Sequence, residues 1–314
     1  MKILFLVDPL STLNIKKDTS FALMLSAHLK THEVYYLSKS GISLSPHGLE
    51  FHVTQIIPKD HPDTPFKCIQ NRTIPANQVD ALFIRTDPPF DDTYLLHTWL
   101  LNHMPTSCFI INNPSGIRTV NEKIWVTKFR DLTPETVITQ NKNLFLTFLK
   151  KHPNIIAKPY NHFGGQGIFK IHQKDPNKHV IFETLTDNGK KPVILQPFIK
   201  DAQNGDKRVL LLNGNPLGAL LRVNNKEDHR NNFFSGGTPL PTTLTQRDLK
   251  IIQTIKPHLI KLGLYFVGID IIGDYLIEVN VTSPTCLREM NQLYHQQLED
   301  KVIEFIETQK KEKT

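Results

Sequence analysis

Two acids and an amide near the end of the chain have the types and spacing to bind a metal ion. Asp270, Glu278 and Asn280 lie in the stretch FVGIDIIGDYLIEVNVTSPTCLR, from Phe266 to Arg288. Carboxylate and amide oxygens suit Mg²⁺, which usually takes one or two carboxylates together with phosphate oxygens and water. The alternative interpretation is the solvated polar face of an ordinary antiparallel hairpin. The placement of these side chains on the predicted strands bears on that choice.

Alternating β-branched residues on either side of Gly273-Asp274 predict two paired strands. The residues that should share one core are Val267, Ile269 and Ile271 on the first strand and Ile277, Val279 and Val281 on the second. Burying both sets together places Ile269 beside Val279 and Ile271 beside Ile277. A plain two-residue turn does not permit that register. We therefore expect an odd-length loop, Gly273 to Tyr275, or a β-bulge.

The same register gathers the polar side chains on one face of the hairpin. Asp270 lies beside Glu278, and Asn280 follows two residues further along that face. Ile272 and Leu276 are expected on this face as well, and carboxylates among apolar neighbours are costly unless a cation offsets them. The pattern therefore favours a metal site.

The composition is that of an ordinary globular protein. A chain of 314 residues is long enough for two or three domains with a substantial core. Its 37 Lys and Arg against 30 Asp and Glu give a formal net charge of +7, but these residues are scattered, which favours anionic small molecules over nucleic acid. Three distant cysteines predict no disulfide framework and no zinc site, and no apolar stretch approaches the roughly 20 residues that span a bilayer. We expect a soluble, cytoplasmic protein without a membrane or nucleic-acid partner.

The first third of the chain has the pattern of an α/β domain with a parallel sheet. Strands are predicted at residues 3–7, 33–37, 81–84 and 109–111, with helices at about 19–29 and 93–103. Asp18 precedes the first helix and ends a polar loop at the carboxyl end of a strand, where open α/β sheets bind ligands. Arg85 follows another strand and precedes an Asp87-Pro88-Pro89 turn. It is either a carboxylate clamp or a surface arginine paired with Asp87.

The middle of the chain holds a candidate phosphate-binding loop. Residues 40–78 carry little pattern, and a break over residues 112–116 places the first domain boundary near residue 120. A helix predicted from Glu122 to Phe129 carries Lys123 near its start. Further along, Gly164-Gly165-Gln166-Gly167 separates two predicted strands, the first of which ends at Lys158. Its backbone N–H groups can close on phosphate, although a plain hairpin turn would have the same pattern.

The last third alternates predicted strands with polar loops. Gly205-Asp206-Lys207-Arg208 leads into one strand, and Arg222 lies near the end of the next. Residues 224–237 form a polar loop of a length that compact domains rarely keep unless it closes over something. Arg230 and Asn232 are the residues of this loop expected to touch substrate. One helix over about 245–262 precedes the metal hairpin, and one long helix over about 288–309 follows it.

These signals stand in a recognisable order along the chain. Lys123, Lys158 before GGQG, QPFI at 196–199, GDKR at 205–208 and RNNFFSGG at 230–237 lead to the predicted metal hairpin. In this order they resemble the ATP-grasp superfamily and, within it, the prokaryotic-type glutathione synthetases. The segments VDPLSTLNIKKDTSFALML, RTDPPFD, LTPETVIT, ETLTDNGK and NVTSPTCLRE are similar to the same family. The resemblance therefore covers nearly the whole chain.

The resemblance implies an ATP-grasp fold that combines α/β and α+β parts. An N-terminal α/β (pre-ATP-grasp) domain would cover residues 1–120, a small central lid 121–200, and a C-terminal antiparallel-sheet domain 201–314. The implied activity is the ligation of γ-L-glutamyl-L-cysteine and glycine through an acyl phosphate, giving glutathione, ADP and phosphate. ATP would be the co-substrate and Mg²⁺ or Mn²⁺ the metal, in a homo-oligomer, either a dimer or a tetramer.

The resemblance also implies roles for individual residues. ATP would be bound by Lys123, Lys158, Gly164, Gly165, Gln166, Gly167, Gln196, Pro197, Phe198, Ile199, Asp206 and Lys207. The dipeptide and glycine would be bound by Asp18, Arg85, Asn232, Ser283, Pro284 and Thr285. Arg208, Arg222 and Arg230 would be catalytic, and the metal ions would be bound by Asp270, Glu278 and Asn280.

Two residues depart from the family pattern. Thr86 stands where a lysine is expected, and Thr238 stands where an arginine is expected after the Gly-Gly pair, which bears on ligand affinity or lid dynamics. Two other functions stay open at this point. A different ATP-grasp carboxylate–amine ligase would lack NIKKDTSF and RTDPPFD, and a non-catalytic nucleotide-binding protein would have lost Arg208 or a metal ligand.

Overall fold

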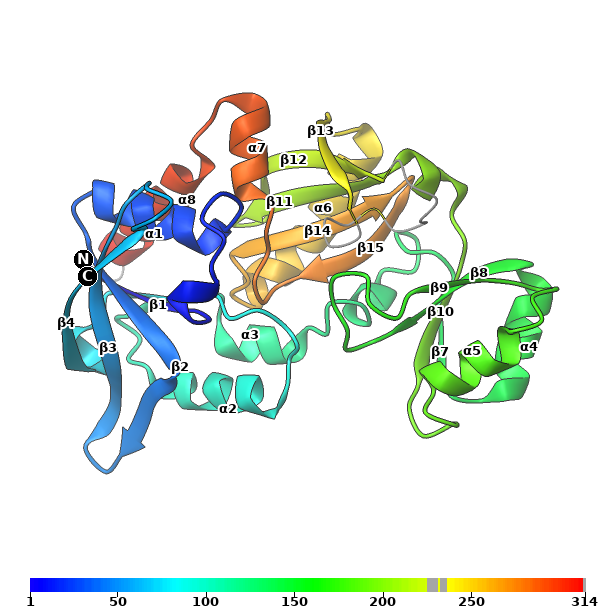
Figure 1. The fold of residues 1–314 in the computed structure, drawn as a ribbon, viewed down its shortest axis with the longest axis horizontal. Coiled ribbons are helices and arrows are strands. Elements are labelled where there is room, and N and C mark those ends of the chain that lie inside the picture. Colours follow the sequence, from blue (N-terminus) through cyan, green and yellow to red (C-terminus); the bar gives the residue numbers. More distant parts are fainter. Residues whose placement is uncertain (225–230, 232–235, 313–314) are drawn as a thin grey trace.

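The computed structural model describes residues 1–224, 231 and 236–312. Figure 1 shows three sheets along the longest axis of the molecule, with the N-terminal sheet at one end, the C-terminal sheet in the middle and a smaller sheet at the other end. In this part of the chain, none of the helices has the length and apolar character needed to cross a membrane.

The N-terminal sheet is parallel at its centre and at one edge and antiparallel at the other edge. In spatial order its strands are β4 (Phe66–Pro75), β3 (Gly48–Pro58), β2 (Glu33–Ser45), β1 (Lys2–Leu6), β5 (Ala81–Ile84) and β6 (Phe109–Ile111). The strands predicted in the α/β pattern are confirmed as β1, β2, β5 and β6. β3 and β4 lie in the segment that carried little pattern. Nearly every side chain of the edge strand β4 is exposed, so no apolar alternation marks it in the sequence.

The helices of this domain begin at capping side chains. The Oδ1 atom of Asp18 accepts a hydrogen bond from the Phe21 N–H at 2.7 Å and starts α1 (Thr19–Leu29). α2 (Asp92–Leu100) follows β5. The predicted pattern break over residues 112–116 is the start of a short helix, α3 (Pro114–Thr119), because Asn113 caps it and proline is favoured in the first turn.

The smaller sheet, which we call the lid, is antiparallel and has its own core. In spatial order its strands are β7 (Val137–Thr139), β10 (Val193–Pro197), β8 (Asn154–Pro159) and β9 (Phe169–His172). α4 (Lys142–Lys151) packs against β7, and α5 (Lys178–Leu185) packs against β8 and β9. Phe145 of α4 stacks on Phe182 of α5 with ring centroids 4.4 Å apart. Among the described residues, this apolar cluster is separate from those of the rest of the molecule.

The C-terminal sheet is antiparallel throughout. In spatial order its strands are β13 (Thr238–Pro241), β12 (Asn215–Val223), β11 (Asp206–Leu212), β14 (Phe266–Ile272) and β15 (Tyr275–Asn280). α6 (Gln246–Lys261) begins at a capping box in which Thr245 and Asp248 bond each other's backbone N–H groups. The predicted single closing helix is wrong, because two helices, α7 (Leu287–Tyr294) and α8 (Leu298–Glu312), are separated at His295, whose φ is 52°.

The hairpin predicted to bind metal is formed by β14 and β15, and its predicted register is confirmed at the strand pair that carries Asp270 and Glu278. Asp270 pairs with Glu278, and Ile269 pairs with Val279. The predicted pairing of Ile271 with Ile277 is wrong. Ile271 pairs with Leu276 across a two-residue turn, and Ile277 is the extra residue of a β-bulge. Leu276 is therefore in the core and Ile277 lines the cleft, the reverse of the expectation.

The bulge follows from contacts with a distant segment. The backbone of residues 122–132 lies beside β15, where Glu122 O accepts from the Val279 N–H at 2.9 Å and Leu132 O accepts from the Leu276 N–H at 2.7 Å. The helix predicted over Glu122 to Phe129 is correspondingly reduced to a 3-10 turn at Trp125–Lys128. This segment therefore hydrogen-bonds along the outer edge of β15 instead of forming an independent helix.

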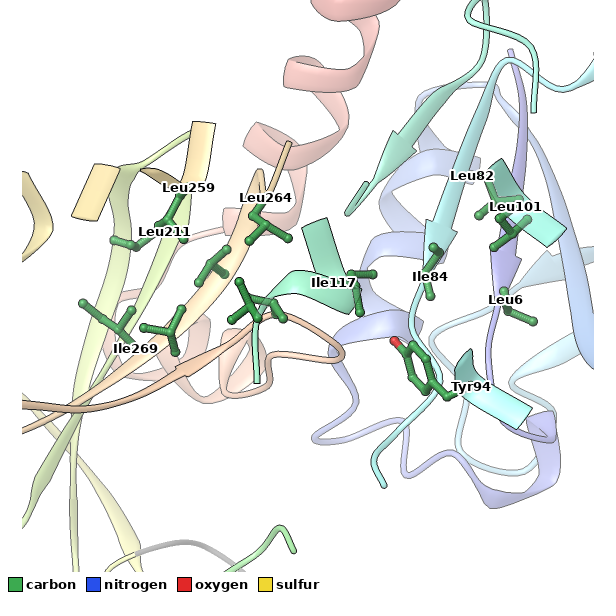
Figure 2. Close-up of a cluster of buried hydrophobic side chains, with 14 of the residues drawn as sticks. Leu6, Leu82, Ile84, Tyr94, Leu101, Ile117, Leu211, Leu259, Leu264 and Ile269 are labelled. Atoms are coloured by element: carbon green, nitrogen blue, oxygen red, sulfur yellow. The ribbon is translucent and has the colours of Figure 1, made fainter. Parts of the chain in front are cut away.

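The N-terminal and C-terminal sheets share their apolar cores. Figure 2 shows one cluster that runs from Leu6, Leu82 and Ile84 beside the first sheet, through Ile117 of α3, to Leu211, Leu264 and Ile269 beside the last. The buried side chain of Asn112 joins the two sheets through hydrogen bonds. Its Oδ1 accepts from the N–H groups of Tyr265 and Phe266, each at 2.8 Å, and its Nδ2 donates to Phe266 O at 2.7 Å and Val281 O at 2.8 Å. These two sheets therefore form one packed body, and the lid extends from it.

Candidate active site

A cavity of about 260 Å³ lies between the lid and the C-terminal sheet, with part of one wall from the N-terminal domain. The predicted site residues that line it are Lys123, Lys158, Gly164, Gly165, Gln166, Gln196, Pro197, Phe198, Ile199, Asp206, Arg208, Arg222, Asp270, Glu278, Asn280, Ser283 and Thr285. Residues separated by more than 150 positions in sequence are thus brought to one place, as the motif order predicts.

A row of charged side chains crosses the floor of this cavity from strand to strand. Arg208 on β11 pairs in register with Asp270 on β14, which pairs with Glu278 on β15. The Arg208 Nε and Nη2 atoms donate to the two Asp270 oxygens at 2.5 and 2.9 Å. Arg222 on β12 lies 3.1 Å from Asp270 Oδ2 and makes a two-pronged pair with Asp206 at 2.6 and 2.9 Å. Two guanidinium groups therefore hold the central carboxylate.

These pairs set the ionisation of the buried acids. Burial alone would raise the pKa of the Asp270 carboxyl, but Arg208 and Arg222 outweigh it and hold that pKa well below its ordinary value. Burial raises the pKa of Asp206, although Arg222 opposes the shift. Asp270 is therefore a fixed negative charge, which is what a metal ligand must be.

Lys123 connects Glu278 on β15 to the lid. Its Nζ lies 2.6 Å from Glu278 Oε1 and donates to His162 O at 2.7 Å. Burial by itself would lower the pKa of this lysine, but Glu278 more than offsets it and the pKa is raised. The ammonium is therefore a permanent charge that reaches both the carboxylate and the loop before GGQG.

The glycine-rich loop is a β-hairpin between β8 and β9, and it also lines the cavity. Gly164, Gly165 and Gly167 have φ of 61°, 77° and 71°, a region that glycine enters without strain. The hairpin interpretation of this sequence is therefore confirmed, and phosphate binding by its backbone stays a prediction. Lys158, at the base of the loop, is buried, and burial lowers its pKa to about 8.

The segment from Gln196 to Ile199 lines the cavity at the joint between the lid and the body. The Gln196 amide donates to Thr136 Oγ1 at 3.0 Å, which fixes that side chain. Lys170 of β9 lies over the Phe198 ring with its Nζ 3.9 Å from the ring centroid. The aromatic ring is thus held in place from outside the cavity.

Several predicted residues lie outside this cavity. Lys207 points to the other face of β11, where it pairs with Asp248 and donates to Thr243 O at 3.0 Å. Asp18 caps α1, and Arg85 is buried behind the wall, with its Nε bonded to Ser20 Oγ at 3.0 Å and its Nη1 to Pro284 O at 2.9 Å. Gly167 and Pro284 adjoin lining residues without lining the cavity themselves, and Arg230 and Asn232 lie outside the described residues.

Four polar residues of the wall were not predicted as site residues. They are Asp87, Glu122, His162 and Asn231. Glu122 Oε1 accepts from the Val281 N–H, the Thr282 N–H and the Thr282 hydroxyl at 3.0, 3.3 and 2.9 Å, and Asn231 donates to Ala202 O at 2.6 Å. Their contacts are with residues distant in sequence, so only the proximity of Glu122 to Lys123 and of Asp87 to Arg85 could have drawn attention to them.

Comparison with known families agrees with this geometry. Residues 1–118 match the family described as prokaryotic glutathione synthetase, N-terminal domain, and residues 122–295 match prokaryotic glutathione synthetase, ATP-grasp domain. The chain belongs to the prokaryotic glutathione synthetase family. The resemblance of the sequence motifs to that family is confirmed.

Relatives in this family align along nearly their whole length. A glutathione synthetase of Vibrio vulnificus (strain YJ016) is 38% identical over 310 residues, 98% of this chain and 97% of its own. The glutathione synthetase of Escherichia coli (strain K12) is 38% identical over 292 residues, 92% of each chain. That of Gloeobacter violaceus is 38% identical over 314 residues, 98% of this chain and 96% of its own.

Solved structures confirm the ATP-grasp fold. The ATP-grasp ligase PsnB complexed with minimal precursor superposes with a TM-score of 0.64 over 98% of this chain and 99% of its own, at 16% identity. The D-cycloserine synthetase DcsG superposes with a TM-score of 0.68 over 97% and 99%, at 11% identity. Membership in the glutathione synthetase family and this fold make the chain an ATP-dependent ligase.

A family that uses ATP and a divalent metal predicts a metal site, and the donor set here fits one. Asp270 and Glu278 are adjacent across two strands, and Asn280 follows on the same side of the cavity. In the described part of the chain, no three His, Cys, Asp or Glu side chains form a metal cluster of their own. Two carboxylates and an amide are the incomplete oxygen set that Mg²⁺ usually completes with phosphate oxygens and water.

Proposed function

We propose that this protein is a glutathione synthetase that ligates γ-L-glutamyl-L-cysteine and glycine at the cost of one ATP, through an acyl phosphate. The observation that carries this proposal is the match to the glutathione synthetase family over both domains, together with the convergence of Arg208, Asp270, Glu278 and Lys158 on one cavity. ADP and phosphate are the other products.

Lys123, Lys158 and the glycine-rich loop are the groups that would hold the ATP phosphates. Both ammonium groups are buried at the cavity, where a charge interacts more strongly with phosphate than it would in water. The segment 196–199, between the lid and the body, would receive the adenine. These residues would bind and orient ATP, and they would take no part in making or breaking covalent bonds.

The reacting carboxylate needs positioning and charge neutralisation. A carboxylate is a poor electrophile, so the γ-phosphoryl group must be transferred to it before the amine attacks, and this transfer depends on aligning the two anions. The paired N–H groups of Arg208 can steady the acyl phosphate and the tetrahedral intermediate, with Arg222 beside it. Burial raises the pKa of the Cys286 thiol, although Arg208 and Arg222 oppose the shift, and the proposed mechanism gives this neighbour no nucleophilic role.

Asp270, Glu278 and Asn280 would hold Mg²⁺, or Mn²⁺ in its place, which would neutralise the phosphate oxygens when bound. This assignment is supported by the side chains that share the cavity and by the low pKa of Asp270. Removal of the metal with EDTA should abolish ADP release, and added Mg²⁺ should restore it.

The remaining assignments extend this proposal. Ser283 and Thr285 line the cavity where the dipeptide and glycine would meet, and Pro284 lies between them and accepts from Arg85, which is buried behind the wall. Asp18, Arg85 and Pro284 would assist donor binding from behind this wall. We further propose a homo-oligomer, dimer or tetramer, that acts in the cytoplasm. The cytoplasmic assignment is supported by three free cysteines, which suit a reducing compartment. We also keep the division at residues 1–120, 121–200 and 201–314 as a proposal, which the three sheets support except that residues 122–132 lie beside the C-terminal sheet.

One assay tests the reaction. ADP release and glutathione formation should require ATP, γ-glutamylcysteine, glycine and Mg²⁺ together, and omission of any one should stop both. Equal ADP release with D-alanine alone would show a different ATP-grasp ligase. ADP release without any amine or carboxylate substrate would show that the bound nucleotide is hydrolysed without ligation.

A further inference from the structure

Asp87 is the one acid that the N-terminal domain contributes to the cavity wall, as far as the described residues show. It belongs to the RTDPP motif after β5, whose arginine alone was given a role. The residue is exposed to the cavity, in contrast to the buried Arg85 and Thr86 before it. Its backbone N–H donates to Asp8 Oδ2 at 2.8 Å, which fixes the start of the turn and leaves the side chain available.

The cations near Asp87 are engaged elsewhere. Lys39 pairs with Asp8 at 2.6 Å, and Arg85 is bonded to Ser20 and to the Pro284 carbonyl. No described Lys, Arg or His forms an ion pair with Asp87. The nearby Ser283 hydroxyl donates to Arg85 O at 3.3 Å, and its proximity opposes the rise that burial causes in the pKa of the Asp87 carboxyl. The Asp87 carboxylate therefore lacks the paired lysine or arginine that Asp206, Asp270 and Glu278 have.

The other cavity acids show how unusual this is. Asp206, Asp270 and Glu278 each have a lysine or arginine within 3.1 Å, and Glu122 has three hydrogen-bond donors. Surrounding residues partly desolvate Asp87 and raise the pKa of its carboxyl, although Arg85 opposes the shift. A partly desolvated carboxylate that faces a cavity gains most from a cation supplied by a ligand.

Both substrates of the proposed reaction carry an ammonium group, and their geometries differ. In the dipeptide, the reacting carboxyl must lie at Arg208 and the metal ligands, while its α-ammonium is at the far end of the γ-glutamyl arm. In glycine, the amine itself must reach the acyl carbon. Asp87 comes from a different domain from Arg208 and the metal ligands, so its position suits the far end of the longer substrate.

We propose that Asp87 binds the α-ammonium of the γ-glutamyl group and so makes the enzyme specific for a γ-glutamyl donor over a plain acyl donor. The inference rests on the proposed function and adds a specificity residue to it. Asp87 would act on binding and orientation of the donor. It would have no part in phosphoryl transfer.

A substrate without the amino group tests this directly. Glutarylcysteine is γ-glutamylcysteine with its α-amino group replaced by hydrogen. For the wild-type enzyme, kcat/KM should be about 10- to 100-fold higher with γ-glutamylcysteine than with glutarylcysteine, the range expected for one charged hydrogen bond. Asp87→Asn should abolish most of this preference by lowering kcat/KM for γ-glutamylcysteine alone, with the KM for glycine unchanged.

A matched control removes a nearby charge that does not line the cavity. Asp92 lies five residues further along, exposed in the first turn of α2, and Asp92→Asn should keep the full wild-type preference. Thermal melts of both variants check that the proteins are folded. A purely structural defect would lower kcat/KM for both donors equally.

Two results would overturn the proposal. In the first, Asp87→Asn keeps the wild-type preference for γ-glutamylcysteine. In the second, it raises the KM for glycine and leaves that for the donor unchanged, which would assign Asp87 to the acceptor amine. A wild-type enzyme that forms no peptide from γ-glutamylcysteine and glycine would refute the proposed function itself, and the two failures are therefore distinct.

Discussion

At the end of the cavity where we propose that the ATP phosphates bind, the phosphate end, Asp270 and Glu278 are held by Arg208 and Lys123. At the N-terminal wall, Asp87 forms no ion pair with any described lysine, arginine or histidine, although the charge of Arg85 opposes the rise that burial causes in the pKa of its carboxyl. In the first region, each of these two carboxylates is already paired with a cationic side chain when no ligand is bound. In the proposed function, Asp270 and Glu278 would hold the metal ion, and the cations that now pair with them would then be available to the ATP phosphates. The second region is balanced only when a cationic ligand binds. The difference separates a catalytic region from a recognition region.

Of the substitutions considered, the removal of one negative charge at the phosphate end should lower turnover the most. Glu278→Gln keeps the shape of the side chain, but it removes half of the carboxylate charge from the metal set and leaves Lys123 without its anion. Turnover should fall by about 100- to 1000-fold, the size reported for a lost preorganised charge or donor. Steady-state ADP release measures this, and circular dichroism checks that the fold is intact. Turnover within threefold of wild type would remove Glu278 from the metal site.

A smaller loss is expected when charge is kept and geometry is changed. Arg208→Lys keeps the positive charge beside Asp270 but loses the two-pronged guanidinium. Turnover should fall by about 100-fold, as for one lost transition-state donor. Arg118→Lys is the control, because Arg118 bonds Thr98 O and Ser115 away from the cavity. Near-normal turnover of Arg208→Lys would exclude the bidentate role.

The pH dependence of ATP binding tests the charge of Lys158. Because burial lowers its pKa to about 8, the ammonium is present below pH 8 and is lost as the pH rises through that value. ATP stays fully ionised there, so its affinity should be about tenfold weaker at pH 9 than at pH 7 with metal in excess. Isothermal titration calorimetry at several pH values measures this. Lys158→Arg should flatten the profile, and an equally steep profile in that variant would assign the effect to another group.

The smallest effect on activity is expected for a substitution of Lys207, which lies on β11 but on the face away from the cavity. Lys207 is next to Arg208 but pairs with the buried Asp248 of the α6 capping box. Lys207→Met should lower the free energy of unfolding by about 1–3 kcal/mol, because it leaves a buried carboxylate unpaired, while the KM for ATP stays unchanged. Urea unfolding measures the first and steady-state kinetics the second. Lys250→Met, an exposed position on α6, should change neither, and a raised KM in Lys207→Met would return Lys207 to the ATP site.

The sequence was sufficient for the parts of the site that depend on local periodicity. Alternation along β14 and β15 predicted that Asp270 faces Glu278, and the order of motifs predicted the ATP-grasp fold. The same alternation, applied to β11, separates Lys207 from Arg208, but motif resemblance placed both in the active site, Lys207 as an ATP-binding residue and Arg208 as a catalytic residue. Periodicity could not choose between Leu276 and Ile277 as the core residue. That choice depends on a hydrogen bond to Leu132, which is 144 positions away in the sequence.

The residues of the cavity wall that the sequence did not predict are likewise positioned by contacts with residues distant in the chain. The pattern around Arg85 left Asp87 as its possible partner, and only the fold shows that Ser20 and the carbonyl of Pro284 take that place. Glu122 is similar, since its three donors come from Val281 and Thr282, just after the end of β15. Contacts of this kind join segments whose order in the chain says nothing about their distance in space.

The buried amide of Asn112 has a consequence for how the molecule unfolds. It joins two sheets that already share their apolar clusters, while the lid keeps a small cluster around Phe145 and Phe182. Amide hydrogens of the two joined sheets should therefore exchange only in a common opening event, and those of the lid should exchange in a separate event of lower free energy. The described residues form three sheets, and we expect them to unfold as two cooperative units whose boundary runs through the cavity between the lid and the C-terminal sheet.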